Sequence, residues 1–297
     1  MSEDRLARRR AERKERIRRR RLAVVAIAIV GLGVLAAAAL AYRHFHRDTP
    51  PPPVVLRTIT LTVPEGYDRS QIAELAKREG LRGDFVAASV RSRYLNPAKY
   101  GGANAQSLEG FLFPDTFELL KNAPVADLVQ LQLDDFKGRI GGVDMSYAKS
   151  KNLTVYDVLT IASMVEREAQ LDSERKLIAA VIYNRLRQGI PLGIDATIRF
   201  AVGNYEQPLT TSELEADSPY NTRLNAGLPP GPIGNPGLAS IEAAAHPAQV
   251  DYLYYVVEPG TCGEHSFSST DAEFQADVAA YNAARDAAGG QSPDTCG

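Results

Sequence analysis

TVYDVLTIASMVEREAQLDSERKLIAAVIYNRLRQG, from Thr154 to Gly189, predicts two consecutive helices joined by a short turn. Thr154 suits the N-cap of the first helix, and Gly189 suits the C-terminal end of the second. Because the turn between them is short, we expect the two helices to pack antiparallel. The apolar residues of the first helix recur at helical spacing and form a single face, which consists of Val158, Ile161, Ala162, Val165 and Ala169.

Short strands accompany these helices. Residues 57–63 (RTITLTV) alternate threonine with apolar side chains, which is typical of a half-buried strand. A short helix should follow, because Asp68 and Gln71 have the spacing of a capping box. Nearer the C-terminus, residues 251–257 (DYLYYVV) and 265–269 (HSFSS) predict two strands joined by a turn. Together these segments predict an α+β fold, rich in helix, with short antiparallel strands.

The N-terminus joins a basic segment to an uncharged apolar one. The 297-residue chain has a net charge of −2, yet residues 1–21 carry eleven Arg or Lys against four Asp or Glu. Residues 22–42 (LAVVAIAIVGLGVLAAAALAY) contain no charge, and a helix of this length spans about 30 Å, the thickness of a bilayer's hydrocarbon core. We therefore predict a single-pass membrane protein whose basic tail, residues 1–21, is cytoplasmic and whose later residues are extracytoplasmic.

Two other interpretations of this terminus are weaker. A cleaved signal peptide would have a shorter apolar core, although Ala36 to Ala41 resembles a cleavage site. The basic segment could suggest nucleic-acid binding, but beside a membrane span it is explained by topology and by attraction to anionic lipid. We therefore predict contact with the lipid bilayer through residues 22–42 and no nucleic-acid partner.

The exported part divides into a linker and two folded parts. Residues 43–56 contain the run DTPPPP, which is typical of a stiff, extended spacer. The strand, turn and short helix within residues 57–107 have a pattern similar to a LysM-type glycan-binding unit. Residues 108–290, which include the helical pair, form the predicted larger domain.

A segment rich in proline and glycine follows the helical pair. Residues 218–237 (SPYNTRLNAGLPPGPIGNPG) contain five prolines and four glycines but only one charged residue. The composition alone would fit a linker, whereas a long irregular segment inside a domain is usually a functional loop. We predict a loop that borders a substrate cleft, followed by a helix whose N-cap is Asn235.

Glu166 is the predicted catalytic residue. It lies one step from the apolar face of its helix, and both Glu166 and Glu168 come late in that helix, where the macrodipole disfavours negative charge. Partial burial and the dipole should favour the protonated carboxylic acid, which is the form that a general acid requires. The competing interpretation is an exposed glutamate that pairs with Arg167 or Arg175.

Further polar residues are candidates for substrate contact because they could bind sugar hydroxyls or carboxylates. Each also has a structural interpretation as a cap, a turn or a surface pair. The candidates are Glu109, Tyr183, Asn184, Arg185, Asp195, Thr197, Ser218, Tyr220, Asn221 and Thr222.

Several catalytic motifs are missing from the sequence. There is no G-x-S-x-G elbow and no phosphate-binding P-loop, and the four histidines and two cysteines lack the spacing of a zinc site. We therefore predict no cofactor and no metal. A disulfide between Cys262 and Cys296 is permitted on the extracytoplasmic side of a membrane, but two free thiols remain an equal alternative.

Five segments in a fixed order resemble the MltG/YceG family of endolytic murein transglycosylases. They are LEGFLFPDTF (108–117), ASMVEREA (162–169), VIYNRLRQGIPLGIDATIRFA (181–201), SPYNTRLNAGLPPGPIGNPGLASIEAAAHPA (218–248) and YLYYVV…HSFSST (252–270). The chain departs from the family pattern at Gly193, Ala196 and Arg223.

The resemblance implies cleavage of the β-1,4 bond between N-acetylmuramic acid and N-acetylglucosamine, with 1,6-anhydro-muramic acid at the new end. Glu166 corresponds to the family's catalytic glutamate. The implied partner is peptidoglycan, with peptidoglycan synthases as possible neighbours and termination of nascent strands as the implied role. Two alternatives stay open: a non-catalytic wall-binding scaffold, and a hydrolytic muramidase with Glu109 or Asp195 as second carboxylate.

Overall fold

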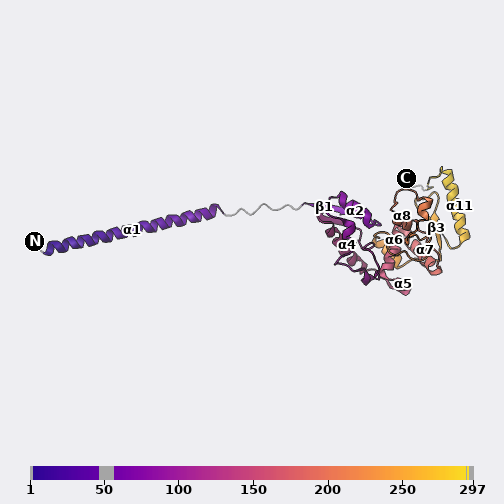
Figure 1. The fold of residues 1–297 in the computed structure, drawn as a ribbon, viewed down its shortest axis with the longest axis horizontal. Helices are drawn as coiled ribbons and strands as arrows, with labels where there is room; N and C mark the ends of the chain where they lie inside the picture. Colours follow the sequence, from indigo (N-terminus) through magenta and orange to yellow (C-terminus); the bar gives the residue numbers. More distant parts are fainter. Residues whose placement is uncertain (1–2, 47–56, 292, 294–297) are drawn as a thin grey trace. The chain divides into compact units, whose positions relative to one another are not determined.

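The chain forms two compact units, residues 1–55 and 56–297, in a computed structural model (Figure 1). The structure describes residues 3–46, 57–291 and 293.

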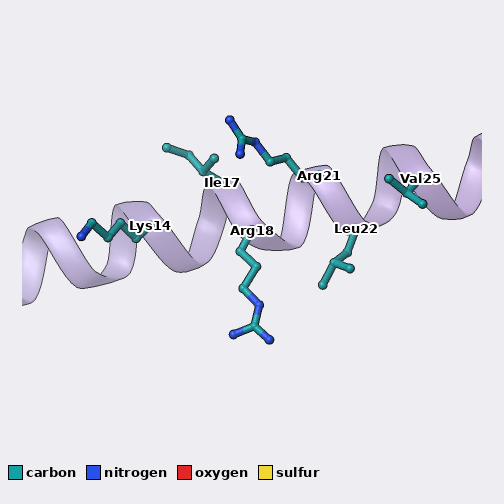
Figure 2. Close-up of a pocket in the computed structure, with 6 residues that line it drawn as sticks. All are labelled: Lys14, Ile17, Arg18, Arg21, Leu22 and Val25. Atoms are coloured by element: carbon teal, nitrogen blue, oxygen red, sulfur yellow. The ribbon is translucent and has the colours of Figure 1, made fainter.

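The first unit contains one long helix, α1 (Glu3–Phe45). Its stretch from Arg8 to Phe45 is long and apolar enough to cross a membrane, with a mean hydropathy of 2.7 in its most apolar window. Figure 2 shows the point at which the basic part, including Arg18 and Arg21, passes into the apolar part at Leu22 and Val25. The helix continues to Phe45, so the first three residues of the predicted linker (43–56) are helical, whereas residues 47–56 lie outside the described residues.

The second unit begins with a strand–helix–helix–strand arrangement. β1 (Thr58–Thr62) pairs antiparallel with β2 (Thr116–Leu120), with Thr58 opposite Leu120 and Thr62 opposite Thr116. Between them lie α2 (Arg69–Arg78), α3 (Phe85–Ala88) and the 3-10 helix η1 (Pro97–Tyr100). The predicted strand and the predicted capping box are both confirmed. β1 lies before the predicted domain boundary at residues 107 and 108, and β2 lies after it, so the sheet crosses that boundary. The domain boundary stays a prediction.

The predicted helical pair forms the centre of this unit. After α4 (Val125–Ile140) and α5 (Ser146–Ser150) come α6 (Val155–Glu168), the 3-10 helix η2 (Asp172–Glu174) and α7 (Arg175–Gln188). Thr154 caps α6, as predicted, and Gly189 ends α7 in the left-handed conformation. α10 (Leu238–Ala245) packs against both α6 and α7. Its apolar residues complete the core around α6.

The C-terminal part contains the predicted hairpin. α8 (Asp195–Val202) and α9 (Thr211–Leu214) precede it. β3 (Tyr254–Val257) pairs antiparallel with β4 (His265–Ser268), and α11 (Asp271–Ala287) packs against this sheet. In the described residues the structure therefore confirms a helix-rich α+β fold with short antiparallel strands.

The proline- and glycine-rich segment is part of the core. All residues from Gly231 to Gly237 are buried, which excludes the linker interpretation for this part of the segment. The prediction that Asn235 caps the following helix is wrong: Gly237 occupies the N-cap of α10. The Asn235 side chain instead forms hydrogen bonds with residues that are distant in the sequence, Gly110 and Glu109.

Candidate active site

The Glu166 carboxylate lies where the ends of three helices meet. Glu166 is near the C-terminal end of α6, and its side chain is only 7% exposed. Its Oε1 accepts a hydrogen bond from Nη1 of Arg175, the first residue of α7, at 2.9 Å. Its Oε2 accepts one from the backbone N–H of Gly237, the N-cap of α10, also at 2.9 Å. The tertiary structure thus surrounds this carboxylate with one guanidinium and one helix N-terminus.

Arg175 holds this junction together. Besides Glu166, its guanidinium donates to Ser240 Oγ at 2.6 Å and to Asp172 Oδ1 at 3.1 Å. The Arg175 side chain is 12% exposed, so the ion pair with Glu166 is largely removed from solvent. The competing interpretation of the sequence, an exposed glutamate paired with Arg167 or Arg175, includes this ion pair but places it at the surface. Glu166 is paired and buried, and its role as a general acid stays a prediction.

The turn at residues 64–67 (PEGY) covers the same junction. The Gly66 N–H donates to the Asn235 carbonyl at 2.8 Å, and the Asn235 N–H donates to the Tyr67 carbonyl at 3.0 Å. Gly66 has a φ of +78°, and a Cβ at this position would lie 3.2 Å from Cγ of Glu166. Glycine is therefore needed here both for the backbone conformation and for the close approach to Glu166.

Asn235 connects three distant segments through its buried side chain. Its Oδ1 accepts from the N–H groups of Gly110 and Leu112, at 2.9 and 3.0 Å. Its Nδ2 donates to the Tyr67 carbonyl at 2.9 Å and to Oε1 of Glu109 at 2.7 Å. All the hydrogen-bonding capacity of this amide is used, which explains why a polar residue can be fully buried here.

Glu109 is a buried carboxyl group on the far side of Asn235. Its Oε2 accepts from the backbone N–H of Arg69 at 3.1 Å. Burial raises the pKa of Glu109 to about 8, and the hydrogen bonds from Arg69 and Asn235 only partly oppose this effect. Its contacts lie with Asn235 and α2 rather than with Glu166, and its proposed role in substrate contact stays a prediction.

The three candidates on α7 donate to the protein's own backbone. The Tyr183 hydroxyl donates to the Ala244 carbonyl at 2.9 Å. Asn184 Nδ2 donates to the carbonyls of Val250 and Tyr252, at 2.8 and 2.9 Å. Arg185 donates to three further carbonyls, those of Leu253, Pro191 and Leu192. These side chains attach neighbouring segments to α7 through most of their donors. Their predicted role in substrate contact stays a prediction.

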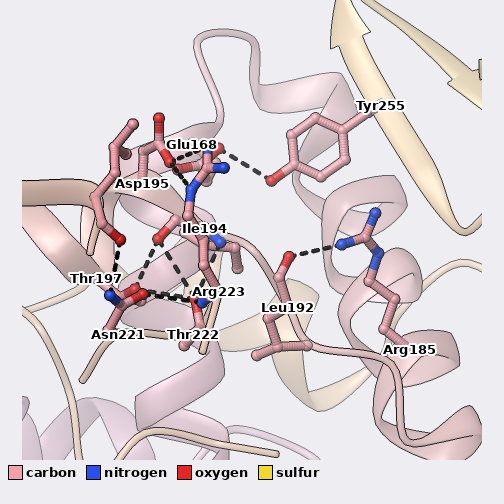
Figure 3. A network of polar contacts seen from close by, with 11 residues as sticks. Glu168, Arg185, Leu192, Ile194, Asp195, Thr197, Asn221, Thr222, Arg223 and Tyr255 are labelled. Atoms are coloured by element: carbon pink, nitrogen blue, oxygen red, sulfur yellow. Dashed lines mark hydrogen bonds and ion pairs between the residues drawn. The ribbon is translucent and has the colours of Figure 1, made fainter. Parts of the chain in front are cut away.

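Asp195 and Thr197 are held by the loop that begins at Ser218 (Figure 3). Asp195 accepts two hydrogen bonds from Arg223, at 2.9 and 2.7 Å, and both side chains are about half exposed. The buried Thr197 and Thr222 hydroxyls are 3.0 Å apart, and Thr222 Oγ1 also accepts from the Ile194 N–H at 3.0 Å. The structure thus brings residues 194–197 and 222–223 together. The prediction that this loop borders a substrate cleft stays a prediction.

The other loop candidates shape the loop itself. Asn221 Nδ2 donates to the carbonyls of Leu214 and Ala216, both at 3.0 Å. Ser218 Oγ accepts from the Tyr220 N–H at 3.2 Å, and the Tyr220 ring packs against Phe200 with centroids 4.9 Å apart. Beyond this loop, the Tyr255 hydroxyl donates to Glu168 at 3.0 Å, and burial raises the pKa of both groups (Figure 3).

A groove of about 600 Å³ lies beside the junction, between α2 and residues 203–207. Tyr67, Gln71 and Tyr205 contribute to its lining. Arg167, the neighbour of Glu166, donates to Gln71 Oε1 at 2.5 Å, and its guanidinium lies 4.8 Å from the centre of the Tyr205 ring. Arg167 therefore contacts two of the residues that line the groove.

Four residues of the junction were not predicted as functional. Arg175 entered only as a possible surface partner, and Ser240, Asn235 and Glu65 were not candidates. The glycines around Glu166 were the available signal, since Gly66, Gly234 and Gly237 each leave space for a neighbouring atom. That signal cannot be interpreted without knowing which segments are adjacent.

The metal and disulfide predictions concern residues outside the Glu166 junction. Within the residues that the structure describes, no group of three or more His, Cys, Asp or Glu side chains could hold a metal ion. The described part also contains no free cysteine. Cys296 lies outside the described residues, so its predicted pairing with Cys262 stays a prediction.

Fold and site together define a carboxylate-centred α+β protein that carries a long apolar N-terminal helix. The model of the YceG-like family matches residues 40–280. The chain therefore belongs to the YceG-like family, as the ordered motifs predicted.

Individual relatives support this assignment. The endolytic murein transglycosylase of Streptococcus pneumoniae strain R6 is 36% identical over 226 residues, which are 67% of this chain and 40% of the relative. The protein of the same name from Bacillus subtilis strain 168 is 39% identical over 166 residues, 55% of this chain and 45% of the relative. This chain thus spans less than half the length of these curated relatives.

A solved structure is also similar. The crystal structure of a yceG-like protein from Listeria monocytogenes superposes with a TM-score of 0.64 at 30% identity. The match covers 73% of this chain and 74% of that one. The fold described here is therefore shared by a relative whose structure has been solved.

Proposed function

We propose that this protein is a membrane-anchored endolytic lytic transglycosylase that cleaves peptidoglycan strands, with Glu166 as its acid and base. The observation that carries the proposal is the position of Glu166, buried and hydrogen-bonded where α6, α7 and α10 meet. Three of the five family-like segments contribute directly to this junction or to its neighbour Asn235. The names of the relatives supply the reaction class.

The proposed reaction needs one carboxyl group. Glu166 in its acid form donates a proton to the glycosidic oxygen, and the bond from that oxygen to the muramic acid C1 breaks. The 6-hydroxyl of the same sugar then attacks C1 and returns its proton to the Glu166 carboxylate. Because the nucleophile belongs to the substrate, proximity replaces the second carboxylate that hydrolytic glycosidases use.

Two features support binding of a long glycan. The groove beside Arg167 combines the tyrosine rings of Tyr67 and Tyr205 with polar groups, a composition that suits sugar rings and hydroxyls. Next to the groove, the elements follow the order β1, α2, α3 and β2. This order suits the LysM-like unit proposed for residues 57–107, with β2 as the strand that pairs with β1. We assign glycan binding to this arrangement and cleavage to residues 108–290.

The apolar part of α1 is the proposed membrane anchor. Its length and hydropathy suit a bilayer, and its basic N-terminal part favours a cytoplasmic tail with the folded unit on the other side. This topology places the folded unit on the side of the membrane where the cell wall is built. A role in terminating nascent strands, beside peptidoglycan synthases, is consistent with that position.

Product mass tests the proposal. The full chain in detergent micelles is incubated with uncrosslinked glycan strands, and the products are analysed by mass spectrometry. We expect 1,6-anhydro ends from the wild-type protein and a loss of turnover by about a thousandfold or more in Glu166→Gln, which keeps the shape but cannot donate the proton. Glu215→Gln, at an exposed position, is the matched control and should retain full turnover.

Other outcomes would favour the alternatives. Products with reducing ends and one added water would indicate a muramidase. Glycan binding without turnover, unchanged in Glu166→Gln, would indicate a scaffold.

A further inference from the structure

A second carboxylate, that of Glu65, lies beside the Glu166 junction. Glu65 belongs to the turn at residues 64–67, directly before Gly66. A Cβ built on Gly237 would lie 1.9 Å from Oε1 of Glu65, while the N–H of Gly237 donates to Oε2 of Glu166. Both carboxylates therefore lie close to Gly237. Glu166 accepts a hydrogen bond from its N–H, and Glu65 occupies the space that a side chain at this position would fill.

The glycines make this approach possible. A Cβ at Gly66 would lie 3.2 Å from Cγ of Glu166, and a Cβ at Gly234 would lie 2.4 Å from the carbonyl oxygen of Gly66. Without side chains at these positions, the turn that carries Glu65 can lie directly on α6 and on the segment before α10. The approach of both Glu65 and Glu166 to Gly237 thus depends on the backbone of two segments that are distant in sequence.

The local charges are unbalanced. Glu65 interacts with Glu166 on α6, with Asp172 on η2 and with Arg175 on α7. Arg175 is the cation among these four groups, and it already contacts both Glu166 and Asp172. Arg167 also lies against the turn, with its Nε 3.7 Å from the Cβ positions of Gly66 and Gly234, and its guanidinium donates to Gln71. Asp115 and Arg139, which line the cavity next to Glu65, pair with each other at 2.8 Å. Burial, followed by the charge of Glu166, raises the pKa of Glu65.

The two carboxylates differ in access to solvent. The Glu166 side chain is 7% exposed, whereas Glu65 is exposed and lines a cavity of about 330 Å³ with Phe113 and Leu238. Glu65 is therefore the carboxylate on the open side of the junction, and Glu166 is the enclosed one.

We propose that Glu65 is a positioning residue that forms an electrostatically coupled pair with Glu166, so that the charge of Glu65 favours the acid form of Glu166 in the presence of Arg175. The inference rests on the proposed function of Glu166. The Arg175 guanidinium favours a negative charge on Glu166, and the negative charge of Glu65 opposes that effect. Glu166 gives its proton to the glycosidic oxygen and recovers one from the 6-hydroxyl, so Glu65 is unchanged at the end of the cycle.

The pH dependence of kcat/KM tests the pair. Wild type, Glu65→Gln and Glu65→Asp are compared as full chains in detergent on uncrosslinked glycan, with Glu118→Gln on the exposed face of β2 as the control. We expect the alkaline limb of the Glu65→Gln profile to move by about one pH unit toward acid, which corresponds to about a tenfold loss on that limb and little loss on the acidic plateau. Glu65→Asp should restore most of the shift, and Glu118→Gln should match wild type.

Four results separate the inference from the proposed function. Equal limbs in wild type and Glu65→Gln would overturn the coupled pair, as would a uniform loss at all pH values with an unchanged unfolding midpoint. Wild-type protein without anhydro products, or an active Glu166→Gln, would instead overturn the proposed function.

Discussion

Among single residues, Glu166 has an electrostatic environment that differs from the one its own helix predicts. From its own helix, the C-terminal dipole of α6 disfavours a negative charge at this position. In the folded protein the N-terminus of α10 and the Arg175 guanidinium both face the carboxylate, and both stabilise negative charge. The electrostatic environment of Glu166 is thus set by α7 and α10 rather than by α6 alone.

Glu109 provides a prediction about stability and pH. Burial raises its pKa to about 8 in the folded protein, against about 4.3 for an ordinary glutamate. Between these values the folded state binds more protons than the unfolded state, so the free energy of unfolding should fall as pH rises, and it should level off above about pH 8. Relative to Glu109→Gln, we expect wild type to lose up to about 1.4 kcal/mol per pH unit across this window, measured by urea unfolding.

A control separates Glu109 from other groups. Glu215 is exposed, so Glu215→Gln should leave the pH profile of wild-type stability unchanged. If Glu109→Gln and wild type gave parallel profiles between about pH 5 and 8, Glu109 would not be the group that titrates.

Among the elements, the segment from Gly231 to Gly237 contributes most to the site although it is neither helix nor strand. Its backbone pairs with the turn at residues 64–67, and Ile233 N–H donates to Ser163 Oγ on α6 at 3.0 Å. Proline restricts the unfolded chain, and glycine allows close contact with α6 and with the turn. The segment therefore functions as a packing element that positions Gly237 against Glu166.

Gly234→Ala tests this packing. The added methyl group would lie 2.4 Å from the Gly66 carbonyl oxygen, a backbone atom that cannot move without shifting the turn. We expect a loss of about 1–3 kcal/mol in the free energy of unfolding, and reduced turnover because the turn lies against Glu166. The control is Gly138→Ala in α4, where nothing lies within 4 Å of the new methyl group and stability should stay equal or rise by up to about 1 kcal/mol. Equal midpoints for the two variants would contradict the assigned packing.

For the whole molecule, the chain divides into residues 1–55, which contain α1, and residues 56–297, which contain the core. The core residues of the second unit all come from its own elements. The stability of the second unit should therefore not depend on α1.

Removal of residues 1–45 tests this division. We expect that the shortened chain does not float with lipid vesicles. Its thermal unfolding midpoint should stay within about 2 °C of that of the full chain. A full chain with Val30→Arg and Leu35→Arg is the matched control, since each charge at the centre of a membrane span costs about 2.5–3.5 kcal/mol. It should also lose vesicle binding. Continued flotation of the shortened chain would mean that the second unit itself binds lipid.

The sequence predicted the elements better than the site. The caps at Thr154 and Asp68, the strand at residues 58–62 and the C-terminal hairpin are all confirmed. Tyr183, Asn184 and Arg185 were predicted to contact substrate from the chemistry of their side chains, and each donates to carbonyl groups of other segments. Their role in substrate contact stays a prediction. A polar side chain has the same appearance in a sequence whether its partner is a sugar or the backbone.

What the sequence determined by itself depends on interactions within a few residues: the caps, the alternation of strand residues and the apolar length of α1. The tertiary structure alone decided that Arg175, Gly237 and the turn with Glu65 would meet at Glu166, and that Asn235 would join Glu109 to Tyr67. These contacts bridge up to 168 residues of chain, and they form because burial of the apolar faces of α6, α7 and α10 brings the attached polar groups together.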